Sequence, residues 1–510
     1  MAGEPIVCRW GIMGAGAISE IFVKDLLIDP KTRDVSDVQH RIVAIGSRSL
    51  AKAKDFISRI GGLAQHAPKA YGSYQEMVLD PEVDVVYVGG HPSSRDSFAY
   101  STERFPSAPP EYILPNGQSD VFFFPSISEQ TGTPHSSHFA DVMLCLGSKR
   151  NVLCEKPMTV SIRTPTHYYM SVNAAQTREL CRVAKEKNCF LMEAVWTRFL
   201  PLTHSLQKII ASGEIGEVQR VSHPDGIILV QSPQFPCPVA KFLSAAPPYF
   251  QTQVDADFSI NFPPDSFSVD HRLVNPDLAG GALLDLGPYP WTMLALTLLH
   301  QNIKPESSPF HGSLDSPPVN LTMPKITASG ALYRHPKATA SSDPVDGSVM
   351  AVLEFPTPSG GKAMGLLISS MLQTTNQDRA VTIYGTKGRI RIPSRKFHPQ
   401  LKAATNIKNW RRCTRFKCQG MREDTVLWEA DEVARSIASG KLECQRMPHR
   451  ESILMMEVEV MQAADALRHI GSTNIIIILG FRRNSSADRI EVSDIYRGNV
   501  LNSCTEWSQR

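Results

Sequence analysis

The feature that most constrains the fold is a glycine-rich turn near the N-terminus, Gly14-Ala-Gly16-Ala-Ile-Ser19. The turn directly follows a short apolar segment and opens a segment with helical periodicity, as in the first strand, turn and helix of a βαβ unit. Plain strand-to-helix turns also contain glycines, so the motif alone is a weak signal. Its place at the start of the chain, with a second strand behind it, favours a dinucleotide-binding Rossmann domain.

The small residues of this turn have separate tasks in such a domain. Gly14 permits the tight turn, and Gly16 leaves room for a pyrophosphate at the helix N-terminus, where Ala17 and Ile18 begin the helix. Ser19 replaces the third glycine of the usual fingerprint and is small enough for close packing of the helix on a strand. We therefore predict that residues 14 and 16–18 contact the cofactor.

The end of the second predicted strand indicates which dinucleotide fits. This strand, residues 41–45, ends in Gly46-Ser47-Arg48-Ser49. NAD enzymes usually place an acidic residue there for the ribose hydroxyls, whereas Arg48 can pair with a 2′-phosphate and Ser47 and Ser49 can hydrogen-bond it. A solvated arginine at a helix start is the alternative, but no carboxylate is present to repel a phosphate. We therefore predict that the cofactor is NADP.

Strand-like and helix-like segments alternate through the first half of the chain, as in a parallel sheet covered by helices. The expected strands are 7–12, 41–45, 83–88 and 151–154, and the expected helices are 17–27, 50–60, 138–146 and 174–187. Asn173 is a plausible N-cap of the last helix. We predict an α/β Rossmann domain with a doubly wound parallel sheet at residues 1–195.

The second half changes to an antiparallel pattern. The expected strands are 218–221, 256–262, 326–334, 349–355, 362–371, 380–384 and 389–392. Residues 385–388 form a turn between the last two, and residues 428–438 form an amphipathic helix. We predict an α+β substrate and dimerisation domain with a large, open, mainly antiparallel sheet at residues 196–457.

Several segments fit neither pattern. They are residues 90–131, 161–172 and 223–255, together with an atypical tail at 458–510. Removing the three internal segments restores continuous strands and helices, so we interpret them as insertions. Translated introns are one origin that we consider for them. The first insertion lies next to the expected cofactor loop, where it could displace Pro134 and His135, and a misplacement of about an ångström can cost on the order of a hundredfold in rate.

Composition narrows the class of protein. Apolar residues make up 42% and charged residues 20%, which is typical of a globular chain. A formal net charge of +3 gives no reason to expect nucleic acid or an acidic membrane as partner. Ten cysteines without a framework indicate reduced thiols and a cytoplasmic location. We expect no signal peptide, no membrane span and no metal site, since Cys413 and Cys418 lack a second pair of ligands.

Five motifs in order resemble the glucose–fructose oxidoreductase/inositol dehydrogenase (Gfo/Idh/MocA) family. Besides the glycine-rich turn, they are Gly132-Thr-Pro-His-Ser-Ser-His138, Cys154-Glu-Lys-Pro157, Met192-Glu-Ala-Val-Trp-Thr-Arg198 and Gly280-Gly-Ala-Leu-Leu-Asp-Leu-Gly-Pro-Tyr289. The resemblance covers most of residues 9–457 and is nearest to the dimeric dihydrodiol dehydrogenases and the NADP-dependent D-xylose 1-dehydrogenases. It implies a Rossmann domain, an open-sheet domain and a homodimer.

The resemblance also implies site residues. Lys156 lies beside the nicotinamide, Tyr289 is the acid/base and Asp285 contacts substrate hydroxyls. The implied cofactor contacts include Pro134, His135, Glu155, Trp196 and Arg198. A lysine cation near a tyrosine favours the phenolate, and residues four apart on a helix share a face, as Asp285 and Tyr289 do.

Each of these residues also has a purely structural alternative. Lys156 could be a surface lysine and Tyr289 a core aromatic, while Asp285 could cap a helix or form a salt bridge. For Trp196, a place in the core is the better interpretation from the bare sequence. The position of Lys156 at the end of an apolar parallel strand favours a functional role for it, because ligands bind at that edge.

The function that these residues favour is NADP-dependent oxidation of the C1 hydroxyl of an aldose such as D-xylose to its lactone. Oxidation of a trans-dihydrodiol is the alternative within the same chemistry. A non-catalytic NADP-binding protein is the alternative from another class, favoured by the insertions and opposed by intact Lys156, Asp285 and Tyr289. A third possibility is a chain that does not fold stably.

Overall fold

The structure analysed is a computed structural model of the 510-residue chain. It describes residues 4–61, 67–89, 137–159, 172–216, 218, 251–299, 324–339, 342, 344–356, 362–376, 380–393, 401–404, 414–416, 426–458 and 477–479. Residues 90–131, most of 161–172 and most of 223–255, interpreted above as insertions, lie outside these ranges. So do Pro134, His135, both cysteines at 413 and 418, and the tail apart from residues 458 and 477–479.

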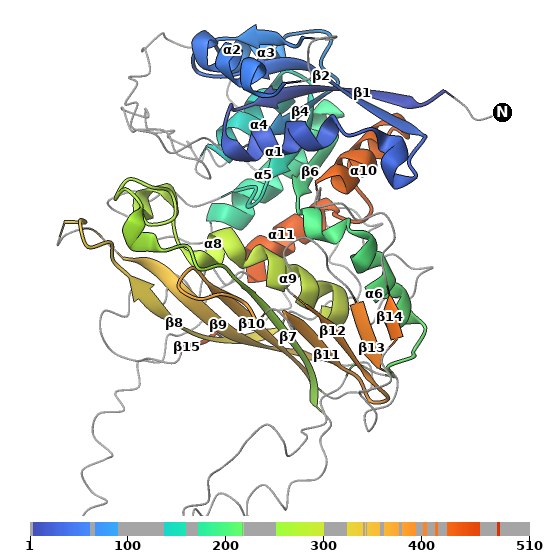
Figure 1. Cartoon of the computed structure of the whole chain (residues 1–510), viewed down its shortest axis with the longest axis vertical. Coiled ribbons are helices and arrows are strands. Elements are labelled where there is room, and N and C mark those ends of the chain that lie inside the picture. Colours follow the sequence, from blue (N-terminus) through green and yellow to red (C-terminus); the bar gives the residue numbers. More distant parts are fainter. Residues whose placement is uncertain are drawn as a thin grey trace, which may run out of the picture.

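The first half of the chain folds around a six-stranded parallel sheet (Figure 1). Its strand order is β3-β2-β1-β4-β5-β6, which is the order of dinucleotide-binding domains. The bounds are β1 Ile6–Met13, β2 Val38–Gly46, β3 Lys69–Tyr71, β4 Val85–Val88, β5 Asn151–Glu155 and β6 Leu191–Ala194. The four strands expected from the sequence are confirmed. Short β3 and β6 were not expected, because three or four residues carry too little periodicity to detect.

Helices connect the strands of this sheet. They are α1 Ala17–Leu26, α2 Leu50–Arg59, α3 Tyr74–Val78, α4 His138–Gly147 and α5 Val172–Lys187, with a 3-10 turn η1 at Pro30–Arg33. The four expected helices are confirmed within a few residues. The expectation that Asn173 caps α5 is wrong, because the helix already begins at Val172.

A nine-stranded sheet forms the second half, in the order β14-β13-β12-β11-β7-β10-β9-β8-β15. Among its described residues, only β7 and β10 pair in parallel and the other pairs are antiparallel, as expected for a mainly antiparallel sheet. The bounds are β7 Gln251–Ser259, β8 Lys325–Tyr333, β9 Val345–Pro356, β10 Lys362–Ser370, β11 Val381–Tyr384, β12 Arg389–Ile392, β13 Leu401–Ala404, β14 Thr414–Phe416 and β15 Ile477–Leu479.

Two expectations for this sheet need adjustment. The strand expected at 256–262 begins at Gln251, inside the segment 223–255 that the sequence set apart. Of the strand expected at 218–221, the described part is Val218, which forms an isolated bridge to Gly385. The turn at 385–388 is confirmed, because Tyr384 pairs with Arg389 and the Gly385 NH donates to the Gly388 carbonyl at 2.8 Å.

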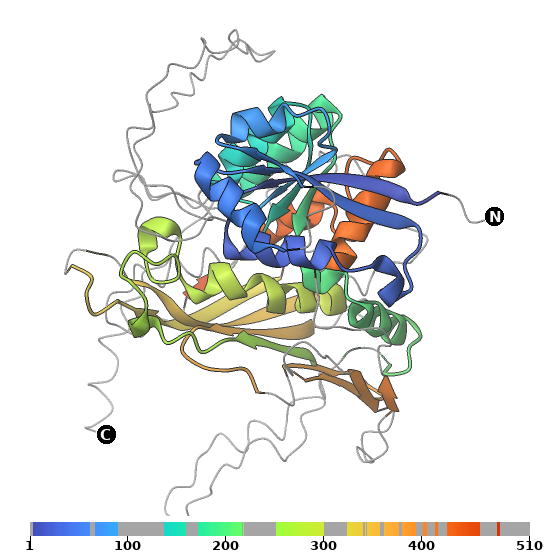
Figure 2. The same cartoon turned by 45° about the horizontal axis from the view of Figure 1, so that its top comes forward.

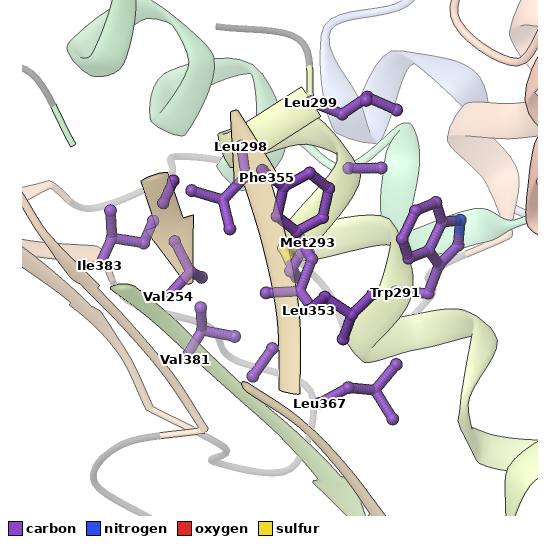
Figure 3. Packing of buried hydrophobic residues seen from close by; sticks show 14 of the residues in the cluster. Val254, Trp291, Met293, Leu298, Leu299, Leu353, Phe355, Leu367, Val381 and Ile383 are labelled. Atoms are coloured by element: carbon purple, nitrogen blue, oxygen red, sulfur yellow. The ribbon is translucent and has the colours of Figure 1, made fainter. Parts of the chain in front are cut away.

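Helices cover the face of the second sheet that is turned toward the first domain (Figure 2). α8 Ala282–Leu286, α9 Pro288–Leu294 and the π-turn η7 Ala295–Leu299 lie on this face, and α6 Pro201–Ala211 packs against η7. Apolar side chains of η7, α9 and the strands pack together here, among them Trp291, Leu298 and Phe355 (Figure 3). This core fixes α9, and with it the residues that precede Trp291, against the sheet.

The last two helices return to the first domain. α10 Leu427–Ala438 contributes Val433 and other apolar residues to the same buried cluster as Trp10 of β1, and Figure 1 shows it beside the first sheet. Asp431 of α10 accepts hydrogen bonds from Arg33 and lies 3.0 Å from His40. α11 His449–Val458 contacts α5 and β6. The helix expected at 428–438 is therefore confirmed, but it packs on the Rossmann sheet.

Candidate active site

The glycine-rich turn lies between β1 and α1. Gly14 has φ +102°, a conformation that favours glycine, and Gly16 is the N-cap of α1 without a side-chain cap bond. Ser19 is fully buried, and a side chain at Gly89, just after β4, would meet the Ser19 hydroxyl at 2.2 Å. The absence of a side chain at Gly89 thus leaves the space that the usual third glycine of the motif would leave. Ala17, the first residue of α1, is exposed, and a helix N-terminus is where a pyrophosphate binds.

Arg48 lies at the same edge, after β2. Ser47 is buried, Ser49 is the N-cap of α2, and the Arg48 side chain is exposed. Burial raises the pKa of Asp141 of α4 to about 6, and the Arg48 cation opposes this shift with a smaller effect. An exposed guanidinium at the ribose end of this edge fits a 2′-phosphate. The glycine-rich turn and Arg48 together form a binding edge that suits NADP.

Lys156 follows β5 and joins the two domains. Its Nζ donates to the backbone oxygen of Asp285 at 2.5 Å and lies 3.2 Å from Asp285 Oδ1. Both side chains are only 9% exposed. A buried lysine so close to a carboxylate keeps its charge, because the pair offsets part of the cost of burial. The structure therefore brings together two residues that the sequence separates by more than a hundred positions.

Tyr289 lies next to this pair. The Lys156 ammonium is 5.0 Å from the centre of the tyrosine ring, and Trp196 Nε1 donates to the phenol oxygen at 3.2 Å. Phe258 of β7 packs on the other side, with ring centres 4.5 Å apart. Asp285 and Tyr289 share a face because Gly287 keeps helical dihedrals between α8 and α9. Pro288 lacks an NH group and is the first residue of α9, so it divides the two helices.

Opposing effects set the pKa values here. Burial lowers the pKa of Lys156, but Asp285, Tyr289 and Glu155 outweigh it, and the net shift is upward. Burial raises the pKa of Tyr289, and Lys156 lowers it. The net shift of Tyr289 is also upward, so the expectation that the lysine draws it toward neutrality is only half met. The lysine acts in the expected direction, but desolvation is larger.

Glu155 lies behind Lys156, in the first domain. Tyr87 donates a hydrogen bond to its Oε1 at 2.6 Å, and its Oε2 accepts from the Lys156 NH at 3.2 Å. Burial raises the pKa of Glu155 despite both bonds. Its side chain thus supports the turn that carries Lys156.

Arg272 is a site residue that the sequence did not reveal. Its Nη1 donates to Asp285 Oδ1 at 2.9 Å, the same oxygen that faces Lys156, and the side chain is 30% exposed. It comes from the loop between β7 and α8, where no periodicity marks a function. Two cations thus share one carboxylate, and the guanidinium and ammonium groups are donors that suit an oxyanion or sugar hydroxyls.

Arg198 does not reach this site. Its Nη2 donates to Glu451 Oε2 of α11 at 2.6 Å, and the pair is almost fully buried. Arg198 thus bonds to α11 and not to Lys156, Asp285 or Tyr289, and its place at the nicotinamide end stays a prediction. Trp196, two residues earlier in the 3-10 turn η3 Trp196–Arg198, does reach Tyr289. The tight turn sends neighbouring side chains in different directions.

The described residues contain neither a metal-binding cluster nor a membrane-spanning helix. No group of three or more His, Cys, Asp or Glu side chains there could hold a metal ion. Within the same part of the chain, every helix is too short or too polar to cross a bilayer.

Known proteins share both the sequence and the fold. The GFO/IDH/MocA C-terminal domain matches residues 251–391. D-xylose 1-dehydrogenase (NADP(+)) of Hypocrea jecorina is 33% identical over 92% of this chain and 94% of its own. Trans-1,2-dihydrobenzene-1,2-diol dehydrogenase of Xenopus tropicalis is 28% identical, over 77% of each chain. An aldose-aldose oxidoreductase from Caulobacter crescentus, solved with glycerol, has a TM-score of 0.55 at 16% identity, covering 92% of this chain and 99% of its own.

Proposed function

The chain belongs to the Gfo/Idh/MocA family of oxidoreductases, and from this premise we propose that it oxidises the C1 hydroxyl of an aldose such as D-xylose to the lactone. It is an NADP-linked dehydrogenase of CH–OH donors. The single observation that carries the proposal is the meeting of Lys156, Asp285 and Tyr289 at the carboxyl edge of the Rossmann sheet. That edge is where a dinucleotide binds.

The residues divide the reaction between them. Tyr289 takes the proton of the substrate hydroxyl, and Lys156 stabilises the phenolate and the developing alkoxide. Asp285 holds Lys156 and Arg272 on one oxygen and binds neighbouring sugar hydroxyls. The cofactor held by the first domain would supply the hydride acceptor and a positive charge that favours the phenolate. Trp196 donates to the phenol oxygen and orients the ring.

The cofactor is held by the first domain. The N-terminus of α1 with Gly14 and Gly16 would take the pyrophosphate, and Arg48 with Ser47 and Ser49 would take the 2′-phosphate. Pro134 and His135, the further cofactor contacts that the family resemblance implies, lie outside the described residues. Glu155 supports Lys156 by accepting a hydrogen bond from its backbone NH.

A trans-dihydrodiol is the alternative substrate. The Xenopus relative is named for this activity, and the same tyrosine and lysine would serve it. Phe258 and Trp196 give the site aromatic walls that would suit a planar ring.

We further propose a homodimer formed through the face of the second sheet opposite α8 and α9.

The test is reduction of NADP by the purified chain, followed by absorbance, with D-xylose and with a benzene trans-dihydrodiol. We expect activity with the sugar and its loss in Tyr289→Phe. Tyr333→Phe is the matched control, because Tyr333 lies on β8 and bonds Asp265 instead. Activity with the diol alone would move the assignment to that substrate. NADP binding without either activity would favour the non-catalytic alternative.

A further inference from the structure

A carboxylate from the second sheet holds the start of α8. Asp346 is the second residue of β9 and is fully buried. Its Oδ2 accepts a hydrogen bond from the backbone NH of Leu283 at 2.7 Å, across 63 positions of sequence. Leu283 lies in the first turn of α8, where NH groups lack partners within the helix. Asp346 therefore fixes where this short helix begins.

Two glycines allow that contact. Gly281 has φ +125°, and a side chain there would meet Asp346 Oδ1 at 2.1 Å. A side chain at Gly280 would meet the carbonyl oxygens of Arg272 at 2.6 Å and Asn275 at 2.8 Å. The β9 carboxylate, the loop that carries Arg272 and the start of α8 thus meet at one crowded point.

The same point sets the geometry of the catalytic residues. Asp285 comes two residues after Leu283, and its Oδ1 faces both Lys156 and Arg272. A shift at the start of α8 would move Asp285 relative to both cations. We propose that Asp346 is a positioning residue, which places Asp285 against Lys156 and Arg272. This inference rests on the proposed function for its kinetic readout.

A merely structural role would give a different result. Asp431 is the matched control, because it is also a fully buried carboxylate that joins distant segments, here Arg33 and His40 of the first domain. Removing either carboxylate lowers stability, since its partners lose their bonds. Of these two carboxylates, only Asp346 bonds the helix that carries Asp285.

The experiment compares Asp346→Ala, Asp346→Asn and Asp431→Asn in the full chain. We expect Asp346→Ala to lower kcat for sugar oxidation about 100-fold with unchanged affinity for NADP. Asp346→Asn keeps an oxygen acceptor and should recover part of the rate, whereas Asp431→Asn should keep kcat. If Asp346→Ala does not fold, Asp346→Asn carries the same comparison. Equal kcat in all variants would overturn the proposal.

A double variant separates positioning from other effects. In an Asp285→Asn background, Asp346→Ala should cost no more than about twofold in kcat, because the group it places is already altered. An undiminished loss in that background would overturn the proposal.

A second readout does not depend on turnover. The reactivity of the Lys156 amine toward an acylating reagent, followed by mass spectrometry across pH, reports its pKa. Loss of the Asp285 contact should lower that pKa in Asp346→Ala and leave it unchanged in Asp431→Asn. If the wild-type chain oxidises neither sugar nor diol, the proposed function fails while this titration still decides the role of Asp346. An unchanged Lys156 titration would refute it.

Discussion

The two halves of the site are built differently. The cofactor half uses the ends of parallel strands, where Gly14, Arg48 and Lys156 each follow a strand within a few residues. The substrate half uses one loop and one short helix on a mixed sheet, and its residues are held by contacts such as Asp346 with Leu283. A parallel sheet places its functional residues through topology, whereas the second domain needs specific side-chain bonds.

This difference implies different sensitivities. Residues of the cofactor half should tolerate change in their neighbours, because strand order alone brings them to one edge. Residues of the substrate half should depend on distant partners.

The largest effect is expected at the junction of the halves. Lys156→Met should lower kcat about a thousandfold, because the phenolate and the alkoxide both lose their cation. Lys185→Met, an exposed lysine on α5, is the control and should leave kcat unchanged. Steady-state kinetics of NADP reduction measures both. A loss smaller than tenfold would assign the lysine to structure.

A pH-dependent effect on stability is expected in the cofactor half. Glu193 of β6 is buried, accepts from the Met158 NH at 2.8 Å, and burial raises its pKa to about 7. Because the folded pKa exceeds the ordinary 4.5, the stability that this proton contributes is complete below about pH 4.5 and is lost as pH rises through about 7.

Between pH 5 and pH 8, the wild type should therefore lose on the order of 3 kcal/mol of its free energy of unfolding relative to Glu193→Gln. Denaturant unfolding at both pH values gives this difference. Glu186→Gln on exposed α5 should show no such difference. Parallel pH profiles for Glu193→Gln and wild type would show that the carboxyl is ionised throughout.

Cofactor choice gives the next effect. Arg48→Ala should weaken NADP binding about thirtyfold, because a charged hydrogen bond to the 2′-phosphate is lost, and should leave NAD binding unchanged. Arg59→Ala serves as the control, because Arg59 lies at the end of α2 and pairs with Asp55. Calorimetric titration with both cofactors decides it. Equal weakening for NAD would place Arg48 away from the 2′ position.

The smallest effect is expected at Arg272. Arg272→Lys keeps the charge but cannot hold Asp285 and a substrate oxygen with one planar group. We expect a rise of about tenfold in KM for the sugar, with little change in kcat or NADP affinity. A change in NADP affinity instead would move Arg272 to the cofactor half.

The sequence predicts the two halves unequally, for the same physical reason. Local motifs of strand, turn and helix revealed Gly14, Arg48 and Lys156, since each depends on neighbours in the chain. Arg272 and Asp346 were missed because their roles arise from contacts over long sequence separations. The contact of Arg198 with Glu451 was missed for the same reason, since Glu451 lies on a helix that returns from the far end of the chain.

The most direct test of the account is a double-mutant cycle between Lys156, from the first domain, and Tyr289, from the second. The measurement is kcat/KM for NADP reduction in Lys156→Met, Tyr289→Phe and the double variant. If the two halves act as one unit, the double variant should be about as slow as the slower single variant. Losses that multiply would mean that the two residues act independently, and would contradict a site built jointly by both domains.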